Sequence, residues 1–168
     1  DIIPYLDAAN VDIKSFDDEI YEKLNAGALD PVLNTLKILK KNKVWLEITN
    51  LVVPSWTDNP EMIKQMCEWL AAEGFSDTPL HFSRFSPMHK LTTLPPTPVE
   101  TLKKAKETAL KAGLKYVYIG NVPELDEENT FCPKCKKMVI ERKGFRVVQN
   151  NLVKGNCKYC NEKIDGVF

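Results

Sequence analysis

The sequence predicts an α/β fold: the C-terminal half of a partial (βα) barrel, with about four βα units, followed by a small cysteine-rich domain. Two observations predict this arrangement. Short apolar stretches alternate with amphipathic stretches through the first part of the chain, and two Cys-x-x-Cys pairs stand near its end. Strands that alternate with helices form parallel βαβ units.

The elements are expected in a regular order. Residues 44–53 are the clearest strand, because they are rich in β-branched side chains and end at Pro54. Helix starts are expected at Asp30-Pro31, at Asn59-Pro60 and at Thr97, where Thr97 and Glu100 form a capping-box pattern. The full set is strands at 8–16, 44–53, 80–85 and 115–119, and helices at 17–24, 30–43, 59–73 and 97–112.

These four units make up half of an eight-unit barrel. Doubly wound open sheets alternate in the same way, so the periodicity alone does not choose between a barrel and an open sheet.

The charge distribution divides the chain in two. Residues 130–168 hold nine Lys or Arg against three acids, a net charge of +6, whereas the whole chain of 168 residues is neutral. The segment 124–129 is polar and acidic and is interpreted as a linker. We therefore expect two domains, 1–125 and 126–168.

The second domain is predicted to be a zinc ribbon. Cys132 and Cys135 form one knuckle, Cys157 and Cys160 form the other, and a hairpin that turns at 143–144 is expected between them. Two knuckles supply four thiolates to one tetrahedral ion, which leaves no open coordination position, so the site is structural. Iron is the second candidate metal, and disulfides are the third interpretation of these cysteines. The fifth cysteine, Cys67, lies in an apolar helical pattern and is expected in the core.

Polar residues mark the expected strand ends. Strand alternation places Asn10, Asp12 and Lys14 on one face, where they either line a cavity for a zwitterion or face water at an edge. His89 follows a later strand, and ligands of parallel α/β folds bind at the carboxyl ends of strands.

Several motifs resemble radical S-adenosylmethionine enzymes of the pyruvate formate-lyase-activating type. In the first domain the motifs are Asp12-Ile13-Lys14, Leu51-Val52-Val53-Pro54 and the run Phe85 to His89. In the second domain the sequence around the cysteines, Ile140-Glu141-Arg142 and the ending Gly166-Val167-Phe168 resemble the AmmeMemoRadiSam system branch.

The resemblance implies a partial (βα)6 barrel in which a [4Fe–4S] cluster cleaves S-adenosylmethionine to a 5′-deoxyadenosyl radical that abstracts hydrogen, in the activases from a protein substrate. It implies that Asp12, Lys14 and His89 contact S-adenosylmethionine. Lys14 would meet the methionyl carboxylate, Asp12 the ammonium group, and His89 the ribose or adenine side.

The sequence departs from this family in two places. No three cysteines have the CxxxCxxC spacing that holds the cluster, and Ser55 follows Pro54 where the activases have glycine. We therefore expect the C-terminal portion of a longer enzyme, inactive by itself and cytoplasmic, with no membrane or nucleic-acid binding.

Two other interpretations remain open. A cluster-free protein would use the basic zinc ribbon to contact nucleic acid or an acidic partner. An isomerase or aldolase would use Lys14 as a Schiff-base nucleophile.

Overall fold

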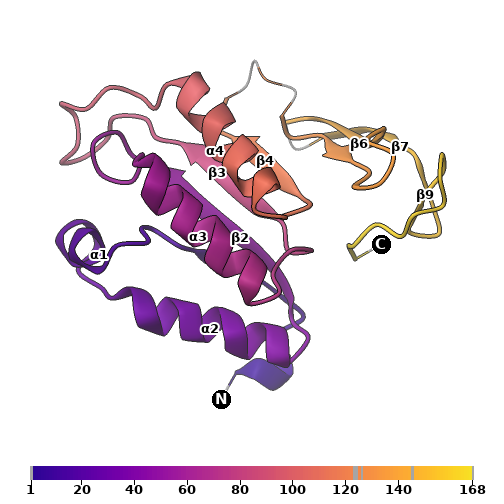
Figure 1. Cartoon of the computed structure of the whole chain (residues 1–168), viewed down its shortest axis with the longest axis horizontal. Coiled ribbons are helices and arrows are strands. Elements are labelled where there is room, and N and C mark those ends of the chain that lie inside the picture. Colours follow the sequence, from indigo (N-terminus) through magenta and orange to yellow (C-terminus); the bar gives the residue numbers. More distant parts are fainter. Residues whose placement is uncertain (1, 123–124, 126, 145, 168) are drawn as a thin grey trace. The chain divides into compact units, whose positions relative to one another are not determined.

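The structure, a computed structural model, describes residues 2–122, 125, 127–144 and 146–167 (Figure 1). The chain divides into two compact units, Asp1–Asn121 and Val122–Phe168. The division falls a few residues before the boundary expected near residue 125. Each unit is described by itself.

The first unit contains a parallel sheet of four strands in the order β1-β2-β3-β4. The described part of this unit also contains four α-helices and one 3-10 turn. The elements are the 3-10 turn Ile3–Tyr5, β1 Ala8–Asp12, α1 Asp18–Asn25, α2 Leu29–Lys41, β2 Trp45–Val52, α3 Pro60–Ala72, β3 Leu80–Arg84, α4 Val99–Lys111 and β4 Val117–Gly120.

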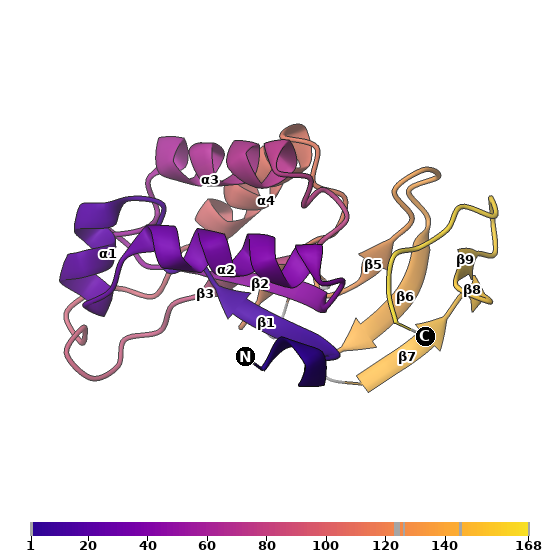
Figure 2. The ribbon, with the colours of Figure 1, turned by 90° about the horizontal axis from the view of Figure 1, so that it is seen from below.

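Helices α2, α3 and α4 cover one face of this sheet (Figures 1 and 2). The strand order follows the chain, and βαβ connections are right-handed, so every crossover helix lies on the same side. A doubly wound sheet reverses its strand order and has helices on both faces. The observed strand order and the single layer of helices therefore differ from those of a doubly wound sheet.

The core lies between this sheet face and the helices. Alternate residues of β2 are buried, and the adjacent strands contribute apolar side chains to the same layer. Each fully buried apolar side chain stabilises the fold by about 1.5–3 kcal/mol. The layer includes Leu46, Ile48 and Val52 of β2, Leu80 and Phe82 of β3, Val117 and Ile119 of β4, and Leu36, Met66, Leu70 and Leu102 of the helices.

Of the three helix starts expected from the sequence, the cap at Asn59 is observed and the caps at Asp30 and Thr97 are not. Asn59 caps α3, since its side chain accepts hydrogen bonds from the backbone N–H groups of Glu61 and Met62. The expected cap at Asp30 is wrong, because α2 already begins at Leu29 and Asp30 lies in its first turn. The capping box at Thr97 is also wrong: the Thr97 hydroxyl bonds to strand backbone instead, and Pro98 holds the cap position of α4.

Two further expectations need correction. The first strand ends at Asp12 rather than at residue 16. Helices follow only the first three strands of the described sheet, because β4 leads into the second unit, so the fourth βα unit lacks its helix.

The second unit is built from short antiparallel strands. They are β5 Thr130–Phe131, β6 Met138–Lys143, β7 Arg146–Asn150, β8 Leu152–Val153 and β9 Asn156–Cys157. The hairpin expected around 143–144 is confirmed as β6 paired with β7. Phe145, which the sequence also places in this hairpin, lies outside the described residues.

The expected linker is partly folded. Glu124 and Asp126 lie outside the described residues, but Asn129 is buried and accepts a hydrogen bond of 2.6 Å from the backbone N–H of Arg142. The Arg142 guanidinium donates to the Glu128 carbonyl at 3.1 Å. Glu128 and Asn129 therefore belong to the second unit. No helix in the described part of the chain is long and apolar enough to cross a membrane.

Candidate metal centre and polar strand ends

The four cysteines of the second unit sit on two turns of the same backbone design. In the first turn the N–H of Lys136 donates to the Cys132 carbonyl at 3.0 Å, and in the second the N–H of Asn161 donates to the Cys157 carbonyl at 2.9 Å. Lys136 and Asn161 both have a φ of 60°, the left-handed conformation. Each turn thus brings a cysteine pair to one point.

Each turn is closed by a second backbone hydrogen bond. The N–H of Cys132 donates to the Lys137 carbonyl at 2.9 Å, and the N–H of Cys157 donates to the Glu162 carbonyl at 2.8 Å. The two knuckles repeat one another, as the equal spacing of the two Cys-x-x-Cys pairs requires.

The four sulfur atoms converge, since their Sγ atoms all lie within 4.8 Å of one another. Cys132 Sγ is 3.6 Å from Cys160 Sγ, and Cys135 Sγ is 3.7 Å from Cys157 Sγ. A tetrahedron with metal–sulfur bonds of about 2.3 Å has sulfur–sulfur edges of about 3.8 Å. The arrangement therefore suits one tetrahedral metal ion such as zinc.

All five cysteines are free thiols, which removes the disulfide interpretation. The sulfur–sulfur edges are far longer than a disulfide bond of about 2.05 Å. They are also too short to surround a four-iron cluster, whose cysteine ligands each bind a separate iron atom.

The thiols of the second knuckle differ in acidity. Burial raises the pKa of Cys157, but hydrogen bonds from the backbone N–H groups of Tyr159 and Cys160 outweigh this and lower the pKa to about 7. A hydrogen bond from the backbone of Glu162 lowers the pKa of Cys160, but burial and the neighbouring thiols raise it to about 12. Metal binding therefore displaces protons from this site.

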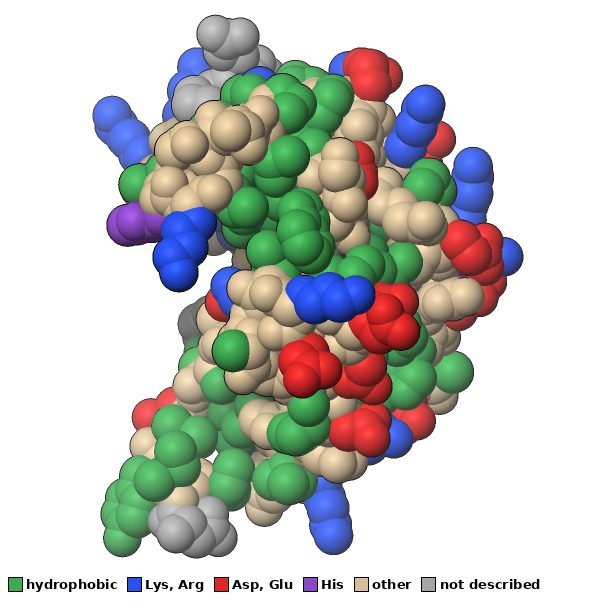
Figure 3. Space-filling view, turned by 90° about the vertical axis from the view of Figure 1, so that its left-hand side faces the viewer, with side chains coloured by type: hydrophobic (Ala, Val, Ile, Leu, Met, Phe, Trp, Pro, Cys, Tyr) green, Lys and Arg blue, Asp and Glu red, His purple; other side chains and the backbone are tan. Residues whose placement is uncertain are grey.

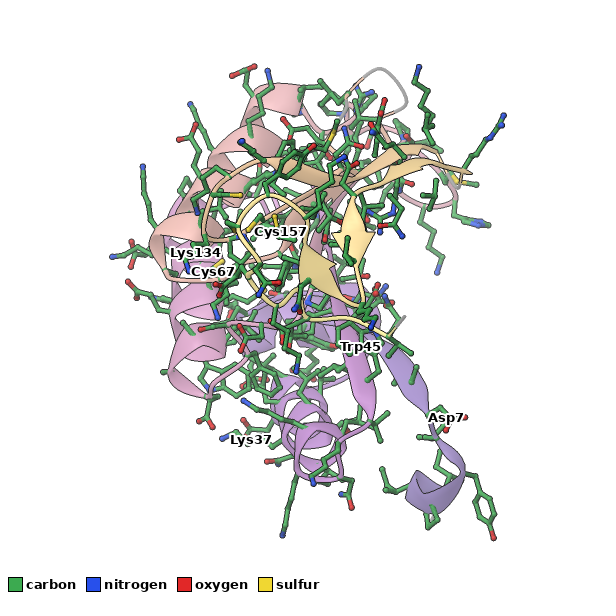
Figure 4. All side chains as sticks on the ribbon, turned by 90° about the vertical axis from the view of Figure 1, so that its right-hand side faces the viewer. Asp7, Lys37, Trp45, Cys67, Lys134 and Cys157 are labelled. Carbon is green, nitrogen blue, oxygen red and sulfur yellow. The ribbon has the colours of Figure 1, made fainter. Side chains whose placement is uncertain are left out.

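Cys67 is not part of this centre. It lies on α3 in the first unit, whereas Cys157 lies in the second (Figure 4). Burial and the Glu68 carboxylate raise the pKa of its thiol to about 12, as expected for an inert core cysteine.

Several basic side chains of the second unit are engaged within it. The ammonium group of Lys134 lies 3.4 Å from the Glu162 carboxylate, and the ammonium groups of Lys137 and Lys158 lie over the Tyr159 ring at 4.8 and 5.0 Å. Part of the positive charge of this unit therefore interacts with side chains of the same unit.

Asp12 and Lys14 form a contact at the carboxyl end of β1. The Lys14 ammonium donates to the Asp12 carboxylate at 2.8 Å, and their side chains are 38% and 45% exposed for lysine and aspartate. β1 is an edge strand of the sheet, so the polar row is accessible at that edge.

His89 lies in the loop between β3 and α4, beyond the carboxyl end of β3. Its side chain is exposed, and its φ of 49° places it in the left-handed conformation. Among the described contacts none joins His89 to Asp12 or Lys14, although all three residues follow carboxyl ends of the same sheet.

The sequence interpretation missed one polar pair. His81 of β3 and Glu47 of β2 meet at 3.0 Å on the sheet face opposite the helices. The signal was the alternation of His81 and Ser83 with buried Leu80 and Phe82, which places both polar residues on one face of a strand.

The chain is similar to known proteins in sequence and in fold. No family model matches the chain. An uncharacterized protein of Methanocaldococcus jannaschii is 47% identical over 165 residues, which is 97% of this chain and 49% of that protein. The chain therefore spans about half the length of this relative.

Among solved structures, a domain of pyruvate-formate lyase-activating enzyme from Bacteroides vulgatus has a TM-score of 0.58 at 14% identity. The likeness covers 71% of each chain. It shows a shared mixed α/β fold with a parallel four-strand sheet.

Proposed function

We propose that this chain is the C-terminal portion of a radical S-adenosylmethionine enzyme of the pyruvate formate-lyase-activating type, in the AmmeMemoRadiSam system branch. The main support is the four-strand parallel sheet in chain order, with its helices on one face and its fold likeness to an activating-enzyme domain. A partial barrel has this geometry, and its sites lie at the carboxyl ends of the strands.

In this proposal Asp12, Lys14 and His89 bind and orient S-adenosylmethionine. Lys14 meets the methionyl carboxylate and Asp12 meets the ammonium group, so their present 2.8 Å contact opens to admit a zwitterion of matching charges. His89 donates a hydrogen bond on the ribose or adenine side. The exposure of all three side chains leaves them accessible to a ligand.

The radical chemistry belongs to a cluster outside this chain. When bound, a [4Fe–4S] cluster with S-adenosylmethionine supplies a 5′-deoxyadenosyl radical that removes hydrogen from a substrate, a protein in the activases. The cysteines present here do not fit that cluster, since four of them converge on a single-ion site and Cys67 is buried elsewhere. The chain alone is therefore expected to be inactive.

The second unit is proposed to be a structural zinc ribbon, with zinc held by Cys132, Cys135, Cys157 and Cys160. Four thiolates fill a tetrahedral site and leave no position for substrate. Iron would fit the same sulfur distances, so metal analysis of protein purified without added metal decides between the two.

The test begins with the reading frame upstream of Asp1. We expect it to encode CxxxCxxC and expect the longer protein, with its cluster reconstituted anaerobically, to form 5′-deoxyadenosine from S-adenosylmethionine under a reductant. Asp12→Asn and Lys14→Met should each reduce this rate about tenfold or more, because each removes a charge-assisted hydrogen bond.

Glu73→Gln is the matched control, since Glu73 pairs with Lys37 on the helical side at the same distance of 2.8 Å. The proposal is wrong if the frame lacks the cysteine motif, or if the longer protein with its cluster does not cleave S-adenosylmethionine.

A further inference from the structure

The sheet face without helices carries a row of polar residues. Asp12, Thr49, His81 and Tyr118 are register partners on β1, β2, β3 and β4, so their side chains project from the same face at one level. Neighbouring strands lie about 4.8 Å apart, which places His81 about 10 Å from Asp12 along this row.

The Glu47 carboxylate holds the His81 ring. Oε2 of Glu47 lies 3.0 Å from Nε2 of His81, and a carboxylate accepts hydrogen bonds, so Nε2 carries the proton. This leaves Nδ1 of neutral His81 as an acceptor. Of the two ring nitrogens, Nε2 is the one that bonds to a described side chain.

Tyr118 packs against one face of the His81 ring. Its ring stacks on the imidazole with a centroid distance of 5.0 Å and an interplanar angle of 20°. The side chains of His81 and Glu47 are 30% and 39% exposed. Glu47 therefore holds the edge of the imidazole and Tyr118 packs on one of its faces, while the ring remains partly exposed.

Stability of the sheet does not explain this cluster. A partly exposed pair of a histidine and a carboxylate contributes no more than about 1 kcal/mol, and parallel sheets ordinarily cover both faces with apolar side chains. A His between a carboxylate and an aromatic ring is instead an arrangement that orients an imidazole toward a ligand.

The charge of this face restricts the ligand. Neither Lys nor Arg occurs among its strand residues, which are Ala8, Asn10, Asp12, Trp45, Glu47, Thr49, Leu51, His81, Ser83, Tyr118 and Gly120. Acidic side chains also gather on the side of the molecule that faces the viewer in Figure 3. Lys14, which follows β1, is paired with Asp12 at the far end of the row, whereas the charge next to His81 is the Glu47 carboxylate. Beside His81 the field therefore favours neutral or cationic N–H groups over phosphate and carboxylate ligands.

We propose that Glu47, His81 and Tyr118 form the substrate subsite beside the cofactor, where Nδ1 of His81 accepts a hydrogen bond from an uncharged amide N–H of the substrate. The position of this subsite beside a cofactor rests on the function proposed above, which assigns Asp12 and Lys14 to S-adenosylmethionine. The subsite itself rests on the geometry of the three side chains.

The experiment uses the chain labelled with ¹³C,¹⁵N-histidine, which has only two histidines, His81 and His89. His89→Gln assigns the two ring signals by NMR. N-acetylglycinamide is the neutral amide probe, and sodium acetate and inorganic phosphate are the anionic comparisons. We expect the amide to shift the His81 ring signals in a saturable way, with His89 unchanged and with no saturable effect of either anion.

Glu47→Gln should weaken amide binding about fivefold, since the charge that polarises the imidazole is lost. Glu73→Gln, which removes a carboxylate on the helical side, should leave binding unchanged. The proposal is overturned if the amide leaves His81 unshifted, if the anions bind His81 equally well, or if Glu47→Gln and Glu73→Gln behave alike.

The two proposals fail separately. If the longer protein does not cleave S-adenosylmethionine but the amide binds at His81, the radical function is wrong and the amide site stands. If cleavage occurs and the amide does not reach His81, only the subsite is wrong.

Discussion

At the scale of single residues, Asn50 holds the strand end on which the proposed cofactor contacts lie. Its side chain is 3% exposed, and its amide nitrogen donates to the Ile13 carbonyl at 2.7 Å. Ile13 stands between Asp12 and Lys14, and its own N–H donates to the Thr49 carbonyl at 2.9 Å. Asn50 therefore fixes the backbone between the two charged side chains.

Asn50→Ala should lower the free energy of unfolding by about 1–3 kcal/mol, because it leaves a buried carbonyl without its donor. Urea denaturation measures the change. Asn42→Ala is the matched control, since the Asn42 side-chain amide makes a similar bond of 2.8 Å to the Ile38 carbonyl at an exposed helix end. An equal loss in both variants would contradict the role of burial at Asn50.

Also at the residue scale, the five thiols should fall into two classes. The zinc-bound protein should react slowly with iodoacetamide at every cysteine, since four thiolates are ligated and burial raises the pKa of Cys67 to about 12. After treatment with a chelator, Cys132, Cys135, Cys157 and Cys160 should be alkylated, and Cys67 only after unfolding. Mass spectrometry identifies the labelled peptides, and early labelling of Cys67 would contradict its burial in the core.

At the scale of elements, two buried threonines fasten the carboxyl ends of the central strands. The Thr57 hydroxyl donates to the Leu51 carbonyl at 2.9 Å and accepts from the Val53 N–H at 2.7 Å. The Thr97 hydroxyl donates to the Val52 carbonyl at 2.6 Å and accepts from the Phe85 N–H at 2.8 Å. Thr97 thus joins the carboxyl end of β2 to the residue that follows β3.

Thr97→Val keeps the shape of the side chain but leaves a buried carbonyl and a buried N–H without partners. We expect it to lower the free energy of unfolding by about 2–6 kcal/mol, at about 1–3 kcal/mol for each of the two unsatisfied groups. Thr35→Val serves as the control, because the Thr35 hydroxyl bonds to the Pro31 carbonyl on an exposed helix face. Thermal and urea unfolding should show a much smaller loss for Thr35→Val.

These bonds explain which parts of the elements could be predicted from sequence. The β-branched residues of the strand 44–53 and the Asn59-Pro60 start of α3 are local signals, and both elements are observed. The pattern of Thr97 and Glu100 is local too, but the hydroxyl of Thr97 is used by strands that approach only in the folded chain. Thr97 does not cap the helix because its hydroxyl bonds to the buried Val52 carbonyl and the buried Phe85 N–H instead.

The candidate sites show the same contrast. The cysteine spacing encodes a metal knuckle within a few residues, so all four ligands could be named from sequence. The pair of Glu47 and His81 depends on the register of β2 against β3. These two residues are 34 positions apart in the chain. No pattern within either strand reports that register.

At the scale of the whole molecule, the two units differ in what stabilises them. The first unit has an extensive core between sheet and helices, whereas the described buried apolar side chains of the second unit are few, chiefly Val139, Ile140 and Ile164 beside the cysteines. Domains this small usually need a metal or disulfides. Since four free thiols converge on one point, a metal ion bound there would supply the missing stabilisation.

Metal removal should therefore unfold the second unit and leave the first one folded. Binding of a structural zinc ion contributes about 10–16 kcal/mol, more than a core of this size provides. Amide hydrogen exchange followed by mass spectrometry, with and without a chelator, should show loss of protection across β6 and β7 but not across β2 and β3. Cys157→Ser should reproduce the effect without a chelator, and Cys67→Ser, in the other unit, should leave β6 and β7 protected. Protection of β6 and β7 that survives chelation would mean that this unit is held by its hairpin and small core alone.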